Sequence, residues 1–130
     1  QSLTDYKGKK VVLYFYPKDF TSGCTKEACG FRDVYAEIQK KGAVVLGCSK
    51  DSVESHKKFA EKYKVNFSLL SDTDGKVTEA YGAWQKKSFL GRTFMGIVRS
   101  TFLIDEQGTI QKIWPRVRPD EHPQQILEAL

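Results

Sequence analysis

The stretch VVLYFYPKDFTSGCTKEAC, residues 11–29, decides the fold, because an apolar run passes through a proline loop into a segment with helical periodicity. Residues 11–16 are six consecutive apolar, β-prone residues between Lys10 and Pro17, a pattern typical of a strand buried on both faces. The helical pattern runs from about Ser22 to Lys40, and residues 43–48 (AVVLGC) have the pattern of a second buried strand. A helix between two such strands predicts parallel pairing in an α/β fold.

The rest of the chain continues the alternation of helices and strands. After residue 50 we expect a helix opened by Asp51 with Glu54, a strand at 67–70, a short helix at 77–81, an irregular stretch through Gly96, a hairpin of 99–104 with 109–114, and a helix capped by Asp120. This order predicts a thioredoxin-like fold, with a central mixed sheet flanked by helices, in a single domain spanning residues 1–130.

Composition narrows the class of protein. Hydrophobic residues make up 40% and charged residues 28% of the chain, which is a globular balance. The net charge of +5 comes from scattered lysine pairs with acidic residues among them, so it does not favour nucleic-acid binding, which needs a concentrated basic stripe. No apolar run approaches the ~18 residues of a membrane span. We therefore expect neither a nucleic-acid partner nor a membrane partner.

The cysteine count indicates the compartment and the chemistry. Three cysteines are an odd number, which argues against a secreted disulfide scaffold and favours a reducing compartment. His56 and His122 are the other soft ligands, and no C-x₂-C or H-x₃-H spacing joins them to a cysteine, so no metal site is expected. We expect Cys48 in the core, His56 partly packed and His122 exposed.

Cys24 and Cys29 fall on different faces of the predicted helix. On a wheel of 3.6 residues per turn, Cys29 lies about 140° around from Cys24, nearer to solvent. The inward face with Cys24 also holds Ala28, Phe31, Tyr35 and Ile38. A free cysteine usually serves as a small, buried apolar residue. However, the unpaired N–H groups of a first helical turn favour a thiolate. Thr21 can add a hydroxyl hydrogen bond to the sulfur, and Pro17 stiffens the loop, so Cys24 is predicted to be a nucleophile.

A disulfide between these two cysteines is incompatible with the helix that carries them. Residues five apart in an ideal helix have Cα atoms roughly 8.5 to 9 Å apart, whereas a disulfide rarely spans more than about 7 Å. If Cys24 and Cys29 pair, the first turns of the helix must unwind. The spacing therefore predicts a redox switch with two conformations.

The stretch PKDFTSGC, residues 17–24, has the form P-x-x-x-T-x-x-C and resembles the active-site loop of the peroxiredoxins. With CTKEAC, LLSD, WQKKSFLGRTFMGI and RSTFLID in the same order, the chain is similar to the bacterioferritin comigratory protein/PrxQ subfamily over nearly its whole length. The resemblance implies that Cys24 is the peroxidatic cysteine and Cys29 the resolving one. It also implies that Pro17 and Thr21 complete the loop and that Arg99 reaches the sulfur. Taken alone, Arg99 is equally a solvated arginine at the start of a strand.

The resemblance further implies an activity and its partners. These are reduction of hydrogen peroxide and organic hydroperoxides through a Cys24 sulfenic acid and a Cys24–Cys29 disulfide, recycled by thioredoxin or a similar dithiol, with no cofactor and no metal. A monomer is expected, in the bacterial cytoplasm or, if a targeting segment was removed, in a plastid stroma. The N-terminal hairpin usual in the family is expected to be absent or clipped.

Two other functions remain open on the residues alone. A thioredoxin-fold disulfide reductase shares the fold, but it normally uses C-x-x-C, where both sulfurs bridge without unwinding. A non-catalytic redox sensor would use the same reactive cysteine pair, so only turnover separates it from a peroxidase.

Overall fold

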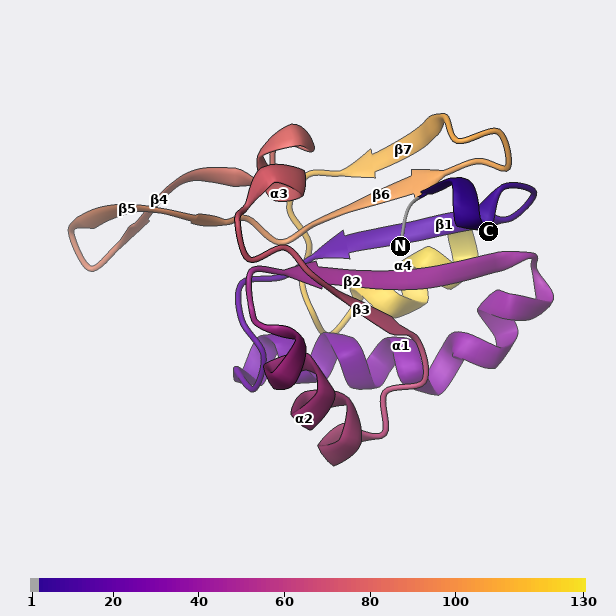
Figure 1. Cartoon of the computed structure of the whole chain (residues 1–130), viewed down its shortest axis with the longest axis horizontal. Coiled ribbons are helices and arrows are strands. Elements are labelled where there is room, and N and C mark those ends of the chain that lie inside the picture. Colours follow the sequence, from indigo (N-terminus) through magenta and orange to yellow (C-terminus); the bar gives the residue numbers. More distant parts are fainter. Residues whose placement is uncertain (1–2) are drawn as a thin grey trace.

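A five-stranded mixed sheet forms the centre of the computed structural model, which describes residues 3–130, without the side chains of 3, 4 and 89. The strands lie in the order β3-β2-β1-β6-β7 (Figure 1). Their bounds are β1 Lys10–Phe15, β2 Ala43–Ser49, β3 Ser68–Ser71, β6 Ser100–Ile104 and β7 Ile110–Trp114. The expected mixed sheet of a thioredoxin-like fold is confirmed.

Strand direction follows from the connections. β1 pairs in parallel with β2, and β2 with β3, because α1 (Ser22–Lys40) and α2 (Val53–Tyr63) make the crossovers. β6 runs antiparallel to both β1 and β7. The carboxyl ends of the three parallel strands therefore meet at one end of the sheet, where the loop from β1 into α1 also lies.

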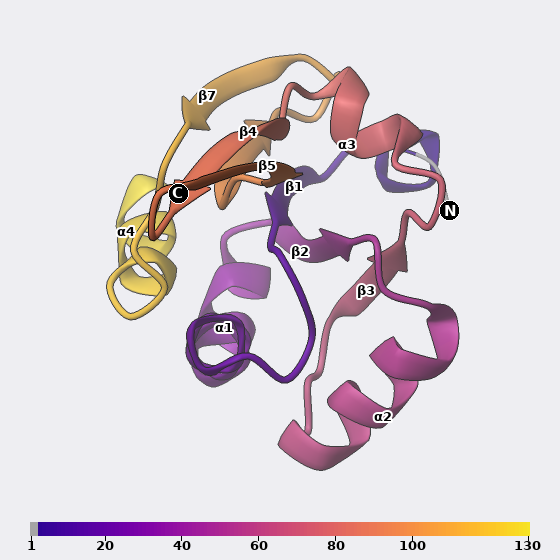
Figure 2. The same ribbon diagram turned by 90° about the vertical axis from the view of Figure 1, so that its left-hand side faces the viewer.

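Helices cover the sheet on both faces (Figure 1, Figure 2). α1, α2 and α4 (His122–Ala129) lie on one face, while the short helix α3 (Lys76–Ala80) and the 3₁₀ turn η1 (Leu3–Tyr6) lie on the other. In the described part of the chain, no helix combines the length and the apolar character that crossing a membrane requires.

The side chains of β1 alternate between two cores, as the period of a strand requires. Val12 and Tyr14 pack with α1, α2 and α4, whereas Val11, Leu13 and Phe15 face the side of α3 and η1. All five are at most 2% exposed, so β1 is buried on both faces, as its continuous apolar sequence predicts.

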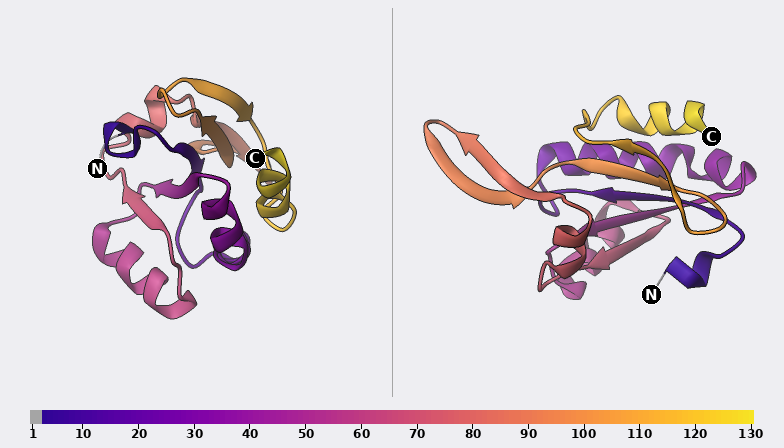
Figure 3. Two further views of the ribbon diagram at one scale, coloured as in Figure 1. Left: turned by 90° about the vertical axis from the view of Figure 1, so that its right-hand side faces the viewer. Right: turned by 90° about the horizontal axis from the view of Figure 1, so that it is seen from above.

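The prediction of an irregular stretch before residue 96 is wrong. β4 (Trp84–Phe89) and β5 (Arg92–Ile97) form an antiparallel hairpin that projects beyond the sheet (Figure 1, Figure 3). Leu90 and Gly91 both have positive φ, 52° and 79°, as a two-residue primed turn requires. Leucine rarely adopts this conformation, and the hairpin lacks one continuous buried face, so its sequence carries neither usual hairpin signal.

Two helix starts also differ from the predictions by one residue. Ser52, not Asp51, caps α2, because its side chain accepts a hydrogen bond from the Ser55 N–H. Glu121, not Asp120, occupies the N-cap of α4 and makes no side-chain cap bond. Several polar residues precede each helix, and sequence alone does not separate adjacent candidates.

Candidate active site

The loop between β1 and α1 carries Pro17 and Thr21, and Cys24 follows it in the first turn of α1. Thr21 is the N-cap of α1, with an extended backbone, and α1 begins at Ser22 as predicted. The Thr21 hydroxyl donates to the Lys18 carbonyl at 2.9 Å. The expected hydroxyl bond to the Cys24 sulfur is therefore not made in this structure, because the hydroxyl proton is used to close the loop.

Cys24 lies in the first turn of α1 and is 1% exposed. The Arg99 Nη2 group donates to its Sγ atom at 3.2 Å. Arg99 immediately precedes β6, so the antiparallel pairing of β6 with β1 brings it back beside the start of α1. The expected contact between Arg99 and the sulfur is present, and both the guanidinium and the helix N-terminus favour negative charge on Sγ.

Gly23 makes room for this contact. A Cβ atom at position 23 would lie 3.2 Å from Arg99 Nη2 and 3.3 Å from Pro119 Cγ. Such distances are tighter than most real Cβ contacts. The absence of a side chain at Gly23 therefore lets the guanidinium pass close to the helix and reach the sulfur.

Glu27 is a site residue that the sequence reasoning missed. It is fully buried in α1, and its Oε1 accepts from Arg99 Nη1 at 2.7 Å. Burial raises the pKa of Glu27 to about 7, although Arg99 opposes the shift. The sequence held a signal for this residue. Residues three apart share a helix face, so Glu27 lies on the same inward face as Cys24, and a buried carboxylate there needs a cation as a partner.

Cys29 is half-buried, and the thiols of Cys24 and Cys29 are both unbridged. α1 is continuous through both residues, which confirms the predicted helix. A disulfide between them therefore requires the start of α1 to unwind, as the Cα separation in a helix implies.

Three side chains of types that can bind a metal ion meet at the loop, from Asp19, Asp51 and His56, with one oxygen or nitrogen atom of each within 4.8 Å of the others. Each of these side chains is already engaged in hydrogen bonds, and His56 uses both ring nitrogens. The cluster is therefore a hydrogen-bond network that ties the loop to α2 and β3, and it would have to be dismantled to ligate a metal.

The other histidine and cysteine predictions have mixed outcomes. Cys48 lies in the core, 1% exposed, and burial raises its pKa to about 12, so its placement is confirmed. His56, expected to be partly packed, is almost fully buried, with 4% exposed. The prediction that His122 is exposed is wrong, because it is fully buried and shares a 2.7 Å hydrogen bond with Thr101 Oγ1. Thr101 lies 21 residues away on β6, so no local pattern reveals this partner.

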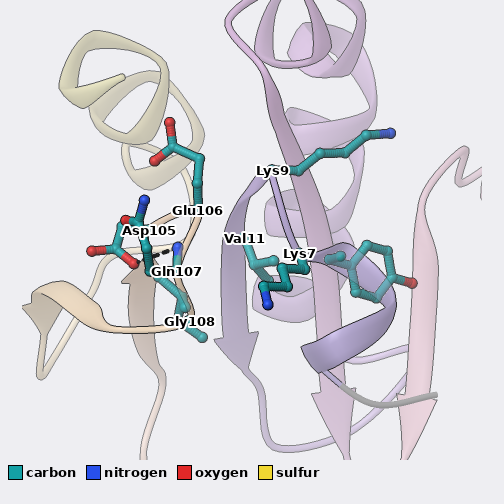
Figure 4. Close-up of a pocket in the computed structure, with 9 residues that line it drawn as sticks. Lys7, Lys9, Val11, Asp105, Glu106, Gln107 and Gly108 are labelled. Carbon is teal, nitrogen blue, oxygen red and sulfur yellow. Dashed lines mark hydrogen bonds between the residues drawn. The ribbon is translucent and has the colours of Figure 1, made fainter.

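A cavity of about 510 Å³ opens beside Arg99, at the base of the β4–β5 hairpin. None of the described residues that line it is acidic, and they are Lys86, Lys87, Ser88, Val98, Arg99, Arg116 and Val117. A second cavity, of about 290 Å³, lies at the opposite end of β1 between Lys9 and Glu106 (Figure 4). Arg99, which bonds the Cys24 sulfur, lines the first of these cavities.

Comparisons with known proteins agree with this geometry. A model of the AhpC/TSA family matches residues 1–113. A Bcp peroxiredoxin of Coxiella burnetii is 56% identical over 99% of this chain and 85% of its own length. Peroxiredoxin Bcp of Bacillus subtilis is 49% identical over 98% of this chain and 82% of its own. The structure of Xanthomonas campestris Peroxiredoxin Q superposes with a TM-score of 0.94 at 39% identity, covering 99% of this chain and 82% of that one. The chain therefore belongs to the AhpC/TSA family, and within it to the Bcp/PrxQ peroxiredoxins, which are thiol-dependent peroxidases.

Proposed function

We propose that Cys24 is the peroxidatic cysteine of this peroxidase and Cys29 the resolving cysteine. One observation carries the proposal: the buried Cys24 Sγ lies in the first turn of α1 with Arg99 Nη2 at 3.2 Å. A helix N-terminus and a guanidinium on the same sulfur are the surroundings in which a thiolate is stable and reactive.

In the peroxide step the Cys24 thiolate attacks the terminal oxygen of a hydroperoxide. An S–O bond forms as the O–O bond breaks, and the departing oxygen takes up a proton and leaves as water or an alcohol. Cys24 becomes a sulfenic acid. Arg99 is placed to stabilise the charge that develops on the leaving oxygen. The Thr21 hydroxyl closes the loop through its bond to the Lys18 carbonyl, and Pro17 fixes the entry of the loop from β1.

In the resolving step the Cys29 sulfur attacks the Cys24 sulfenic acid. An S–S bond forms, the S–O bond breaks and the hydroxyl leaves as water with one proton. Because α1 separates the two sulfurs, its first turns unwind before this step. The cycle closes when a dithiol gives two electrons to the disulfide.

The substrates proposed are hydrogen peroxide and organic hydroperoxides. A Xanthomonas campestris bacterioferritin comigratory protein, 38% identical with a TM-score of 0.94, is described with alkyl peroxide reduction activity. We extend that activity to this chain. Thioredoxin or a similar dithiol is the reductant we propose, acting on a monomer in the bacterial cytoplasm or a plastid stroma.

A stopped-flow experiment tests the roles of both cysteines. Reduced protein is mixed with one equivalent of hydrogen peroxide while tryptophan fluorescence is followed, in the wild type, Cys24→Ser and Cys29→Ser. The fast signal is expected to vanish in Cys24→Ser, and Cys29→Ser is expected to accumulate a trappable sulfenic acid. If the wild type reacts no faster than a simple thiol, the roles proposed for Cys24 and Cys29 fail.

The same samples separate the alternatives. A disulfide reductase would reduce an insulin-type disulfide without peroxide, and a sensor would oxidise once without turnover in the presence of thioredoxin and its reductase. Steady peroxide consumption in the coupled assay distinguishes the peroxidase from both.

A further inference from the structure

A buried polar network anchors the peroxidatic loop at the carboxyl ends of the three parallel strands. Asp19, in the middle of the loop, is 3% exposed, and His56, in the first turn of α2, is 4% exposed. Neither residue contacts the Cys24 sulfur, and the peroxidase cycle described above does not use them. Their burial therefore needs another explanation.

The Asp19 carboxylate accepts three hydrogen bonds. Tyr16 donates its hydroxyl to Oδ1 at 2.6 Å, while Ser55 Oγ at 2.8 Å and His56 Nδ1 at 2.7 Å bond to Oδ2. The Asp19 backbone N–H in turn donates to Asp51 Oδ2 at 2.8 Å. One loop residue is thus tied to the end of β1, the loop before α2 and the first turn of α2.

The partners of His56 fix its protonation state. Nε2 lies 2.9 Å from the Leu70 carbonyl, which can only accept, so Nε2 carries a proton. Nδ1 lies 2.7 Å from Asp19 Oδ2. The Tyr16 hydroxyl oxygen also lies 3.2 Å from Nδ1, but its proton is given to Asp19 Oδ1 at 2.6 Å, so Tyr16 offers no proton to Nδ1. A bare Nδ1 would press its lone pair against the carboxylate, and His56 is therefore an imidazolium.

The charges around His56 agree with this assignment. Burial alone would lower the pKa of His56, but its hydrogen bond to Asp19, the charge of Asp19, its hydrogen bond to the Leu70 carbonyl and the charge of Asp51 raise it above the ordinary value. Burial alone would raise the pKa of Asp19, but hydrogen bonds from His56, Tyr16 and Ser55 lower it. Burial raises the pKa of Tyr16, so that this hydroxyl stays a neutral donor.

The loop that the pair anchors is strained. Phe20, directly after Asp19, has φ of 67°, a left-handed conformation that costs a non-glycine residue free energy unless neighbouring contacts impose it. Thr21, the N-cap of α1, follows at once. Release of Asp19 would therefore loosen the residues that start the helix and place Cys24.

We propose that Asp19 and His56 are positioning residues. Their buried imidazolium–carboxylate pair holds the loop of residues 17–21 in the conformation that presents Cys24 to peroxide. The same pair restrains the unwinding of α1 that lets Cys29 reach Cys24. This inference rests on the roles proposed above for Cys24 and Cys29. It assigns opposite effects on the two chemical steps, since the anchored loop favours the peroxide step and opposes the resolving step.

Two rate constants measured on the same variants test the proposal. Asp19→Asn and His56→Gln remove the charge pair with little change of shape, and Ser55→Ala is the matched control, because it removes one hydrogen bond to the same carboxylate and leaves the pair. We expect both charge variants to lower the second-order constant for hydrogen peroxide by roughly tenfold, because they remove a hydrogen bond in which both partners are charged. The first-order resolving constant should rise several-fold. Ser55→Ala removes one hydrogen bond from a neutral donor and leaves the charge pair, so it should change both constants by clearly less than either charge variant does.

The pH dependence adds a readout that a purely structural role would not move. The pair is complete between the lowered pKa of Asp19, below 3.8, and the raised pKa of His56, above 6.5. As pH rises through the His56 value, His56 loses its proton and the restraint weakens. The ratio of the His56→Gln resolving constant to that of the wild type should therefore be large at pH 6 and fall towards 1 at high pH.

NMR of the two histidines tests the charge pair independently of any turnover. The chain has two histidines, and burial lowers the pKa of His122 to about 4, so His122 serves as an internal neutral reference. At pH 7 both nitrogens of His56 should be protonated and His122 should be neutral. Asp19→Asn should shift the His56 titration to lower pH.

Two results would overturn the proposal. One is a neutral His56 at pH 7 in the wild type; the other is a pair of rate constants within twofold of the wild type in folded Asp19→Asn and His56→Gln. Failure of the roles proposed for Cys24 and Cys29 gives a different result, because the wild type itself would then react with peroxide no faster than a simple thiol. The NMR result would still decide whether the Asp19–His56 pair exists.

Discussion

Arg99 shows how much a single residue does in this site. Its fork bonds the Cys24 sulfur through Nη2 and the buried Glu27 carboxylate through Nη1. The planar guanidinium fixes both donors at once, whereas an ammonium is a point charge that cannot reproduce the two directions. The carboxylate thus holds the guanidinium in place against the sulfur.

Arg99→Lys is expected to lower the second-order rate constant with hydrogen peroxide by on the order of 10²-fold, the usual cost of losing one preorganised donor to a developing charge. Stopped-flow fluorescence measures the constant. Arg116→Lys is the control, since Arg116 lines the same cavity and is exposed; its rate should stay within twofold. Equal losses in both variants would contradict a specific role for the Arg99 fork.

Gly23→Ala tests the close approach of the guanidinium to α1. The new Cβ would lie 3.2 Å from Arg99 Nη2, and the 2.7 Å bond to Glu27 limits how far the guanidinium can retreat. We expect the peroxide rate constant to fall roughly tenfold, because reacting groups are displaced by a fraction of an ångström. Global stability, followed by urea unfolding, should change by less than about 1 kcal/mol. An unchanged rate constant would show that the site accommodates the added methyl group without displacing the Arg99 guanidinium from the sulfur.

At the scale of elements, α1 links the site to the rest of the molecule. Its first turn holds Cys24, and its middle packs on α4 through Gly30, where a Cβ would lie 2.7 Å from Pro123 Cγ. Further along, Phe31 contacts His122 edge-on, with ring centroids 5.9 Å apart. The start of α1 therefore carries the reactive cysteine, and its middle packs against α4.

Gly30→Ala tests whether the packing in the middle of α1 affects the reaction at its start. The overlap with Pro123 should cost about 1 to 3 kcal/mol through overpacking, and the helix propensity gained from alanine offsets only part of it. The urea midpoint should fall while the peroxide rate constant stays within twofold. Glu37→Ala, on the exposed face of the same helix, should change stability by less than about 0.5 kcal/mol. A slower peroxide reaction would show that α4 packing also positions Cys24.

At the scale of the whole molecule, two buried groups on different elements oppose each other in pH-dependent stability. Glu27 has a pKa raised to about 7 from 4.5, so between these values the folded protein binds more protons and gains stability as pH falls. His122 has a pKa lowered to about 4 from 6.5, so there the unfolded chain binds more protons and stability is lost as pH falls. The two contributions largely cancel between about pH 4.5 and 6.5.

Glu27→Gln should make the stability of the folded protein fall with pH, because the opposing contribution of His122 is then no longer cancelled. We expect nearly flat wild-type stability over this range and, in the variant, a loss on the order of a few kcal/mol as pH falls through it. Urea unfolding at several pH values measures the effect. Glu37→Gln makes the same charge change on the surface and should leave the flat profile unchanged. A variant curve parallel to the wild-type curve would contradict the opposing linkages.

That residues 1–130 form a single domain stays a prediction. Both cores share β1, with alternate side chains on either face, so one should not melt without the other. Far-UV and near-UV circular dichroism should report coincident urea transitions. Separate midpoints would show that the two faces unfold independently.

The sequence by itself determined the features that depend on local pattern. The apolar run of β1, the bounds of α1 and the first-turn position of Cys24 follow from periodicity and loop chemistry, which act over a few residues. The motif around Pro17, Thr21 and Cys24 likewise indicated the family correctly. The β4–β5 hairpin was missed because its turn uses a left-handed leucine, a conformation that the hairpin imposes and the residue does not favour.

Only the tertiary structure decided which distant groups meet. The pairing of β6 with β1 brings Arg99 to Cys24 and Glu27, and parallel strand ends bring His56 to Asp19. His122 is buried against Thr101 for the same reason. A buried charge or ring nitrogen needs a partner but does not specify where along the chain that partner lies, because hydrogen bonds act in space and not along the sequence.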